Sequence, residues 1–233
     1  LKWALGVSLA SALIVPFIAG RWTPMIAFGL FLAFWVVASA AVNVKERVRH
    51  IKGGLWERLR VQGRSYWGMQ LAHLGVAVFI IGVTLVKGYE VERDVRMDIG
   101  DSVTVNDYAF KFEGTKEIRG PNYTGARGSV EVTKNGRYIE HLYPEKRIYN
   151  VQQMPMTEAA IDTGILGDIY VSLGEPVGGD AWVIRVYYKP FVTWIWGGCV
   201  LMAIGGLFAL ADRRYRLLAR RDEAALAAKT ATT

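Results

Sequence analysis

The sequence predicts an α-helical polytopic membrane protein with an inserted extracytoplasmic antiparallel β domain. The chain has 233 residues, 52% of them hydrophobic, and the apolar residues gather in four long stretches without Asp, Glu, Lys or Arg. About 100 residues between the third and fourth stretches show strand-like alternation instead. One Cys and three His are too few for a disulfide framework or a closed zinc site, and the high apolar content excludes a disordered chain.

The four uncharged stretches are long enough to cross a bilayer. They comprise residues 3–20, 22–44, 65–86 and 190–211. About 20 apolar residues span the hydrocarbon core, and prolines such as Pro16 and Pro190 are tolerated inside helical bundles. Four such stretches argue against a buried helix of a soluble domain. Because the chain begins at Leu1 inside an apolar run, without an initiator Met, we expect it to be part of a longer protein.

The distribution of basic residues predicts the orientation. Residues 45–64 carry seven basic and two acidic residues, and the tail 212–233 carries six basic and three acidic ones. Both segments are therefore expected in the cytoplasm. Residues 87–189 carry 13 basic and 16 acidic residues and are expected on the other side. The net charge of +7 is then a topology signal, and we expect no nucleic acid partner.

The basic cytoplasmic segment 45–64 contains an amphipathic pattern. Its apolar residues recur at steps of three and four: Val48, Ile51, Leu55, Trp56 and Leu59. This pattern predicts a helix lying in the membrane interface, broken by Gly53-Gly54. His50 is interpreted as an ordinary interfacial residue.

Residues 87–189 are expected to form an antiparallel sandwich or barrel. Strands are expected at residues 90–97, 103–105, 108–112, 128–133, 138–143, 168–173 and 181–188. Asn106-Asp107 and Asn135-Gly136 are the turn signals between neighbouring strands. The segment has no Cys, and its one histidine, His141, is expected at the surface, so nothing in it predicts a metal or nucleophile site.

His73, in the third stretch, is the residue that carries chemistry, because ionisable side chains inside a membrane are costly and face the protein interior. A helical wheel places it with Tyr66, Met69, Gln70, Ala77, Ile80 and Thr84, and places Gly68, Gly75 and Gly82 on the opposite, closely packing face. His73 could donate a hydrogen bond to a neighbouring helix, take part in a proton relay, or ligate haem iron. A second axial ligand would come from outside these four stretches. Cys199 is interpreted as a small apolar residue.

Several motifs resemble those of the CcmF family of cytochrome c biogenesis proteins. The run Gln70-Leu71-Ala72-His73-Leu74-Gly75-Val76-Ala77 resembles the family's transmembrane histidine segment. The other matching stretches are GPNY at 120–123, PEKRIY at 144–149, MTEAAI at 156–161, DIYVSLGE at 168–175, YYKPF at 187–191, WIW at 194–196 and DRRYR at 212–216.

The resemblance implies a polytopic protein of the bacterial inner (plasma) membrane that belongs to the haem lyase system, which attaches haem to the CxxCH cysteines of apocytochrome c at the periplasmic face. The family holds a b-type haem through two transmembrane histidines, and His73 matches the second. The first histidine is absent here, and Trp194-Ile195-Trp196 lacks the Asp of the family's haem-handling WWD motif. We therefore expect a C-terminal portion, incomplete as an enzyme by itself.

The implied cofactor is haem b, with haem also the substrate, and the implied partners are the lipid bilayer, apocytochrome c and other maturation proteins: a haem chaperone and an apocytochrome-handling subunit. The alternative is a non-catalytic membrane scaffold of the cytochrome c maturation complex. A transporter or quinone-linked subunit is disfavoured, because the spans offer no charged path.

Overall fold

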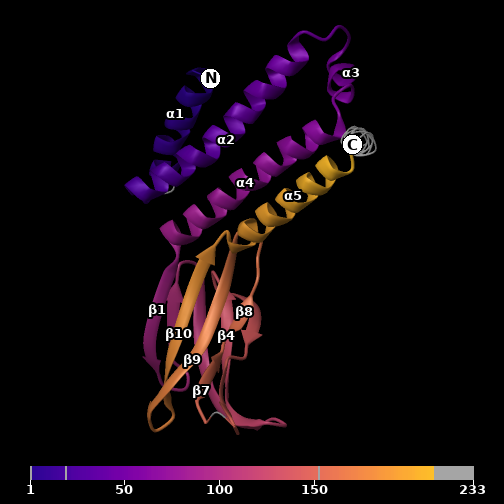
Figure 1. Ribbon diagram of the computed structural model, residues 1–233. Helices are drawn as coiled ribbons and strands as arrows, with labels where there is room; N and C mark the ends of the chain where they lie inside the picture. Colours follow the sequence, from indigo (N-terminus) through magenta and orange to yellow (C-terminus); the bar gives the residue numbers. More distant parts are fainter. Residues whose placement is uncertain (1, 19, 152, 213–233) are drawn as a thin grey trace, which may run out of the picture. The chain divides into compact units, whose positions relative to one another are not determined.

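The computed structural model describes residues 2–18, 20–151 and 153–212. The described residues form two compact units: a helical unit, with residues up to Thr84 and from Trp194 to Asp212, and a β unit from Leu85 to Thr193 (Figure 1). The β unit is therefore an insertion between helices, as the sequence predicts. The basic tail lies, from residue 213 onward, outside the described residues.

Five helices are described: α1 (Lys2–Ile18), α2 (Pro24–Arg49), α3 (Leu55–Arg60), α4 (Arg64–Tyr89) and α5 (Val192–Leu210). Thr23 begins α2, since its hydroxyl accepts a hydrogen bond from the Ile26 N–H at 3.2 Å and Pro24 follows at the first helical position. Helices α2, α4 and α5 are long and apolar enough to cross a membrane. Helix α1 is apolar but has 17 residues, so the crossing expected for residues 3–20 stays a prediction.

The basic connection between α2 and α4 is not one continuous helix. Helix α2 continues through the charged residues to Arg49, and the short helix α3 begins only at Leu55. Gly53, with a φ of 117°, lies in the interruption, in a conformation that favours glycine. The Gly54 N–H donates to the Glu57 carboxylate at 3.1 Å, which closes the first turn of α3. Its location in the membrane interface stays a prediction.

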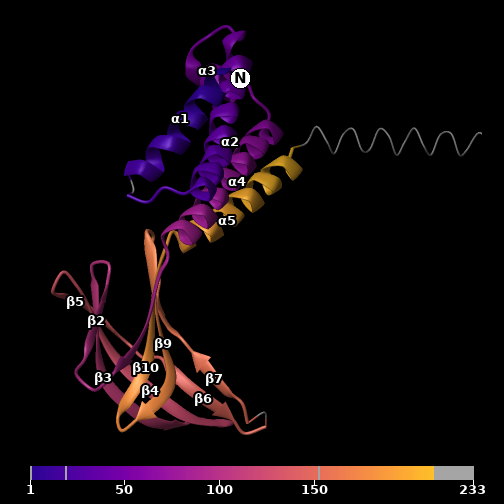
Figure 2. The ribbon, with the colours of Figure 1, turned by 90° about the vertical axis from the view of Figure 1, so that its left-hand side faces the viewer.

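Helices α4 and α5 pack together through glycines, and both views show them side by side (Figures 1 and 2). A Cβ at Gly75 would lie 2.7 Å from the Gly198 carbonyl oxygen, and one at Gly205 would lie 2.6 Å from the Gly68 carbonyl oxygen. The backbones therefore touch along this face, which confirms the packing role predicted for the glycine face of α4. At one end, the Ser65 N–H donates to the Asp212 carboxylate at 3.0 Å.

The β unit consists of two antiparallel sheets (Figure 2). The four-stranded sheet has the order β1-β10-β9-β8, and the six-stranded sheet has the order β2-β3-β4-β6-β7 with β5 paired to β4. The strands are β1 (Val91–Met97), β2 (Ser102–Val105), β3 (Tyr108–Arg119), β4 (Tyr123–Lys134), β5 (Arg137–Leu142), β6 (Glu145–Tyr149), β7 (Pro155–Glu158), β8 (Ala160–Asp162), β9 (Gly167–Gly178) and β10 (Ala181–Pro190).

The core of the β unit lies between the inner faces of these sheets. Phe110 and Phe112 from β3 and Val130 and Val132 from β4 are fully buried, and they belong to one cluster with Ile184 of β10. Each pair is spaced by two residues, because alternate residues of a strand face the same side. The alternation that predicted the strands therefore also selects the core residues.

Three strands, β6, β7 and β8, are not predicted from the sequence. They have three to five residues and contain or adjoin charged side chains, so their periodicity is too short to stand out. Both expected turns are present: Asn106, Asn135 and Gly136 have positive φ values of 52°, 50° and 77°, as tight hairpins require.

Glu145 is a carboxylate buried in the β unit between two arginines. Arg127 Nε donates to it at 2.7 Å and Arg147 Nε at 2.6 Å. Burial by itself would raise the pKa of Glu145, but the hydrogen bonds from Arg147 and Arg127 outweigh it and hold the pKa below its ordinary value of 4.5. The ion pair with Arg127 joins β6 to β4, whereas Arg147 lies in β6 itself.

We predict that Gly205→Ala destabilises the helical unit and that its neighbour Gly206→Ala does not. A Cβ at Gly205 would meet the Ala72 nitrogen at 2.6 Å, whereas a Cβ at Gly206 has no atom within 4 Å among the described residues. Overpacking of this kind costs roughly 1–3 kcal/mol. Thermal unfolding in detergent should show a lower apparent Tm for Gly205→Ala alone. Equal Tm values for both variants would contradict the close packing of α4 and α5.

Glu145→Gln is expected to lower the free energy of unfolding by about 1–3 kcal/mol, because two charge-assisted hydrogen bonds weaken. Since the folded pKa of Glu145 lies below 4.5, its stabilisation is fully present above that pH and is lost as the pH falls through the folded pKa. The free energies of unfolding of wild type and variant should therefore converge as the pH is lowered from 7 to 3. The control is Asp94→Asn, which removes an exposed partner of Arg185 and should change little.

Candidate functional site

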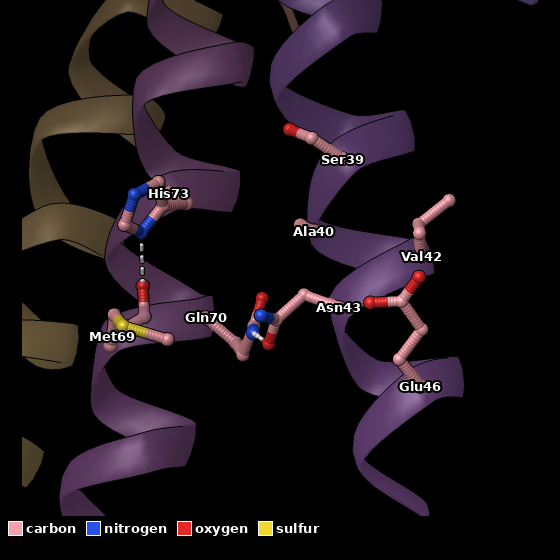
Figure 3. A pocket seen from close by; sticks show the side chains of 8 residues that line it. All are labelled: Ser39, Ala40, Val42, Asn43, Glu46, Met69, Gln70 and His73. Carbon is pink, nitrogen blue, oxygen red and sulfur yellow. Dashed lines mark hydrogen bonds between the residues drawn. The ribbon is translucent and has the colours of Figure 1, made fainter. Parts of the chain in front are cut away.

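A cavity of about 410 Å³ lies between α2 and α4 in the helical unit (Figure 3). Helix α2 contributes Ser39, Ala40, Val42, Asn43 and Glu46, and helix α4 contributes Met69, Gln70 and His73. The residues of α4 recur at steps of three and four, so they form one face of that helix. The glycine face of α4 packs against α5, so the face with Met69, Gln70 and His73 is turned towards α2.

The imidazole of His73 is held by its own helix. Its Nδ1 lies 2.8 Å from the Met69 carbonyl oxygen (Figure 3). Because a carbonyl oxygen accepts hydrogen bonds and does not donate them, Nδ1 carries the proton and Nε2 keeps its lone pair. Among the described residues, none binds Nε2, and the side chain is exposed there. His73 therefore offers one nitrogen lone pair at the cavity.

Asn43 connects the two helices beside His73. Its Oδ1 accepts hydrogen bonds from Tyr66 Oη at 2.9 Å and from Gln70 Nε2 at 3.0 Å. The guanidinium of Arg47 lies 4.6 Å from the centre of the Tyr66 ring, and its Nε donates to Gln62 at 2.7 Å. These contacts set the position of α2 against the face of α4 that carries His73.

The polar residues of α2 were missed by the sequence analysis, which treated residues 22–44 as an apolar span. Ser39, Asn43 and Glu46 follow one another at steps of four and three, so a polar stripe at the end of the apolar run was a usable signal. The Ser39 hydroxyl donates to the Trp35 carbonyl at 2.7 Å within its own helix. Glu46 brings a carboxylate to the cavity that holds the histidine.

The cavity supplies one imidazole nitrogen as a candidate ligand. The described residues contain no group of three or more His, Cys, Asp or Glu side chains that could hold a metal ion. A haem brings its own equatorial nitrogens and needs only axial ligands from the protein. A histidine whose Nδ1 proton is held by a backbone carbonyl is a common arrangement for such a ligand. The residues present therefore fit one side of a haem iron.

The other two histidines and the cysteine offer no comparable site. His50 is an exposed residue at the C-terminal end of α2. His141 of β5 lies 3.3 Å from the Glu113 carboxylate through Nε2 and 3.0 Å from Tyr138 Oη through Nδ1, so both ring nitrogens are engaged. A hydrogen bond from Ser129 and the charge of His141 lower the pKa of Glu113. Cys199 is half-buried in α5.

The comparisons with known proteins agree on one family. Residues 88–190 match the family described as the CcmF C-terminal beta-sandwich. The chain is 48% identical over 197 residues to the cytochrome c-type biogenesis protein CcmF of Pseudomonas aeruginosa, covering 84% of this chain and 29% of that protein. It is 44% identical over 210 residues to CcmF of Escherichia coli K12, covering 90% and 31%.

The solved structure of a protein titled cytochrome c heme lyase CcmF has the same fold. The TM-score is 0.71 at 18% identity, over 90% of this chain and 34% of that one. The chain spans about a third of the length of the relatives it matches. The helices, the inserted β-sandwich and the sequence identity together show that the chain belongs to the CcmF family of cytochrome c-type biogenesis proteins and matches the C-terminal portion of its members.

Proposed function

We propose that this chain is the C-terminal part of a haem lyase and that His73 supplies one axial ligand to an internal b-type haem. The β unit would serve the attachment of haem to apocytochrome c at the periplasmic face. The observation that carries the proposal is the His73 imidazole at the cavity between α2 and α4, with Nδ1 held at 2.8 Å by the Met69 carbonyl. The second axial ligand would come from outside this chain segment.

Five residues of the cavity have proposed roles that follow from their chemistry. Bound there, the haem would supply a redox-active iron. His73 would bind that iron through Nε2, and the Met69 carbonyl keeps the ring in one orientation by holding the Nδ1 proton. The aliphatic surfaces of Ala40 and Val42 would exclude water from one side of the cavity. Asn43 acts as a positioning residue, because it fastens α2 to the helix that carries His73.

The topology supports a β unit on the periplasmic side of the inner membrane. If α4 and α5 both cross, the segment between them lies on one side of the bilayer. The excess of basic residues in 45–64, at the other end of α4, indicates that this segment lies in the cytoplasm. The β unit would then lie on the opposite side. The β unit could then meet the haem chaperone, the apocytochrome-handling subunit and apocytochrome c, the partners proposed from the family.

A non-catalytic scaffold is the second candidate function. The hydrogen bonds of Asn43 with Gln70 and with the neighbouring Tyr66 join α2 to α4, which is a packing role for polar side chains. In that case His73 would also be a packing residue, and the β unit would recruit maturation proteins. The two proposals differ in whether the nitrogen lone pair of His73 is needed.

We expect His73→Ala to abolish or strongly reduce the b-type haem signal of the full-length protein, because it removes the axial nitrogen. The measurement is a reduced-minus-oxidised absorption spectrum with a pyridine haemochrome assay on the purified protein. His50→Ala removes an exposed histidine away from the cavity and should leave the signal unchanged. Unchanged haem content in His73→Ala would overturn the ligand assignment.

His73→Asn separates the ligand from the scaffold role. An amide preserves a hydrogen-bonding side chain but is a poor ligand for haem iron, so the ligand proposal predicts loss of both haem and cytochrome c maturation. The scaffold proposal predicts that maturation persists. Maturation is read as the amount of holocytochrome c detected by haem staining.

Asn43→Ala should reduce the haem retained per protein, because the Tyr66 hydroxyl and the Gln70 amide both lose their shared acceptor and α2 is less firmly held. Ser39→Ala is the matched control, since Ser39 also lines the cavity but bonds within its own helix. The readout is the ratio of haem to protein after purification. Equal ratios for the two variants would argue against a positioning role for Asn43.

A further inference from the structure

The loop between β8 and β9, residues 163–166, presents two consecutive apolar side chains. Ile165 is 74% exposed and Leu166 is 63% exposed, in a chain segment where polar residues would be expected at a water-facing turn. Gly164 before them donates its N–H to the buried Asp168 carboxylate at 3.1 Å, which braces the loop. The loop is thus a fixed feature that displays Ile165 and Leu166 outward.

This loop is tied to the start of α5. The Phe191 N–H donates to the Leu166 carbonyl at 3.1 Å, and the Thr193 hydroxyl donates to the Gly164 carbonyl at 2.8 Å. Residues 191–193 are where β10 ends and α5 begins. The two hydrogen bonds therefore hold the loop against the end of β10 and the residues that open α5.

The residues on both sides of this junction have the composition of a membrane boundary. Trp194 and Trp196 lie in the first two turns of α5, and tryptophan is enriched where a spanning helix meets the headgroups. On the other side, the Lys189 ammonium lies 4.9 Å from the ring centres of both Tyr170 and Tyr187. A lysine among tyrosines, followed by tryptophans and an uncharged helix, is the composition expected where a chain enters a membrane.

We propose that Ile165 and Leu166 insert into the boundary between headgroups and acyl chains beside the first turn of α5, so that the β8–β9 loop anchors the β unit to the lipid surface. The continuity of the loop with a helix that can span the bilayer argues for lipid as the occupant, since residues at that level meet lipid. The inference rests on the proposed crossing of α5 and is independent of the role of His73.

The test uses the full-length protein in lipid nanodiscs, with Cys199→Ala and any other cysteines replaced. A nitroxide label is attached at Ile165→Cys, and its accessibility to oxygen and to the water-soluble complex NiEDDA is measured by power saturation. Val151→Cys is the matched water-facing control, because Val151 is an apolar turn residue that is 93% exposed between β6 and β7. Val200→Cys, within α5, reports separately on whether that helix crosses the bilayer.

The proposal predicts a mobile label at position 165 that is more accessible to oxygen than to NiEDDA, with a ratio at least several-fold above that of position 151. If the label at position 165 has the same ratio of oxygen to NiEDDA accessibility as the label at position 151, the proposal is overturned. A high ratio at position 200 would then show that α5 crosses the bilayer and that only the insertion of the loop is wrong. An immobilised label at 165 that neither reagent reaches also overturns it, because protein and not lipid would cover the loop.

Discussion

The close approach of α4 and α5 is the constraint on which the helical unit depends. Glycines at intervals of seven residues remove the side chains that would separate the two backbones, so Gly68 and Gly75 meet Gly205 and Gly198 directly. This contact determines the rotation of α4 about its own axis. Because the glycine face packs against α5, the face with Met69, Gln70 and His73 is turned towards α2, and the histidine lines the cavity between α2 and α4. The ligand candidate and the glycine ridge lie on opposite sides of α4 because of their spacing in the sequence.

In the inserted β unit, the strands that follow α4 and precede α5 are also neighbours. Its first strand, β1, pairs with its last, β10, so that Val91 lies opposite Tyr188. The chain therefore leaves α4 through β1 and returns to α5 through the adjacent strand β10. About 100 residues are inserted in this way while the first and last strands of the β unit stay side by side. Within the unit, long-range pairing joins segments that are far apart in sequence, and Glu145 adds a buried ionic contact between β6 and β4. Such an insertion adds a separately folded β unit between two helices that are long and apolar enough to cross a membrane.

The cavity brings together His73, the candidate ligand, and the groups that hold it in position. A lone histidine in an apolar helix is consistent with several roles, but the Nδ1 contact to Met69 leaves Nε2 as the available donor atom. Asn43 and Tyr66 add a polar connection between the helices next to it. This arrangement favours a preorganised ligand, because the ring orientation does not depend on a partner from another helix. The scaffold alternative uses the same contacts but leaves the lone pair of Nε2 without a function.

The sequence by itself determined the class of the protein, the inserted antiparallel domain, both tight hairpin turns and His73 as the one candidate site residue, because each depends on local composition or on periodicity along one element. It did not reveal the short strands β6, β7 and β8, which exist only because neighbouring strands supply their hydrogen bonds. It also missed Asn43 and Glu46 as neighbours of His73, since they lie about 30 residues away on another helix. The contact between α4 and α5 sets the rotation of α4, and this rotation decides which residues of α2 face His73. Such a contact between helices depends on tertiary packing and is not visible in the sequence of either helix.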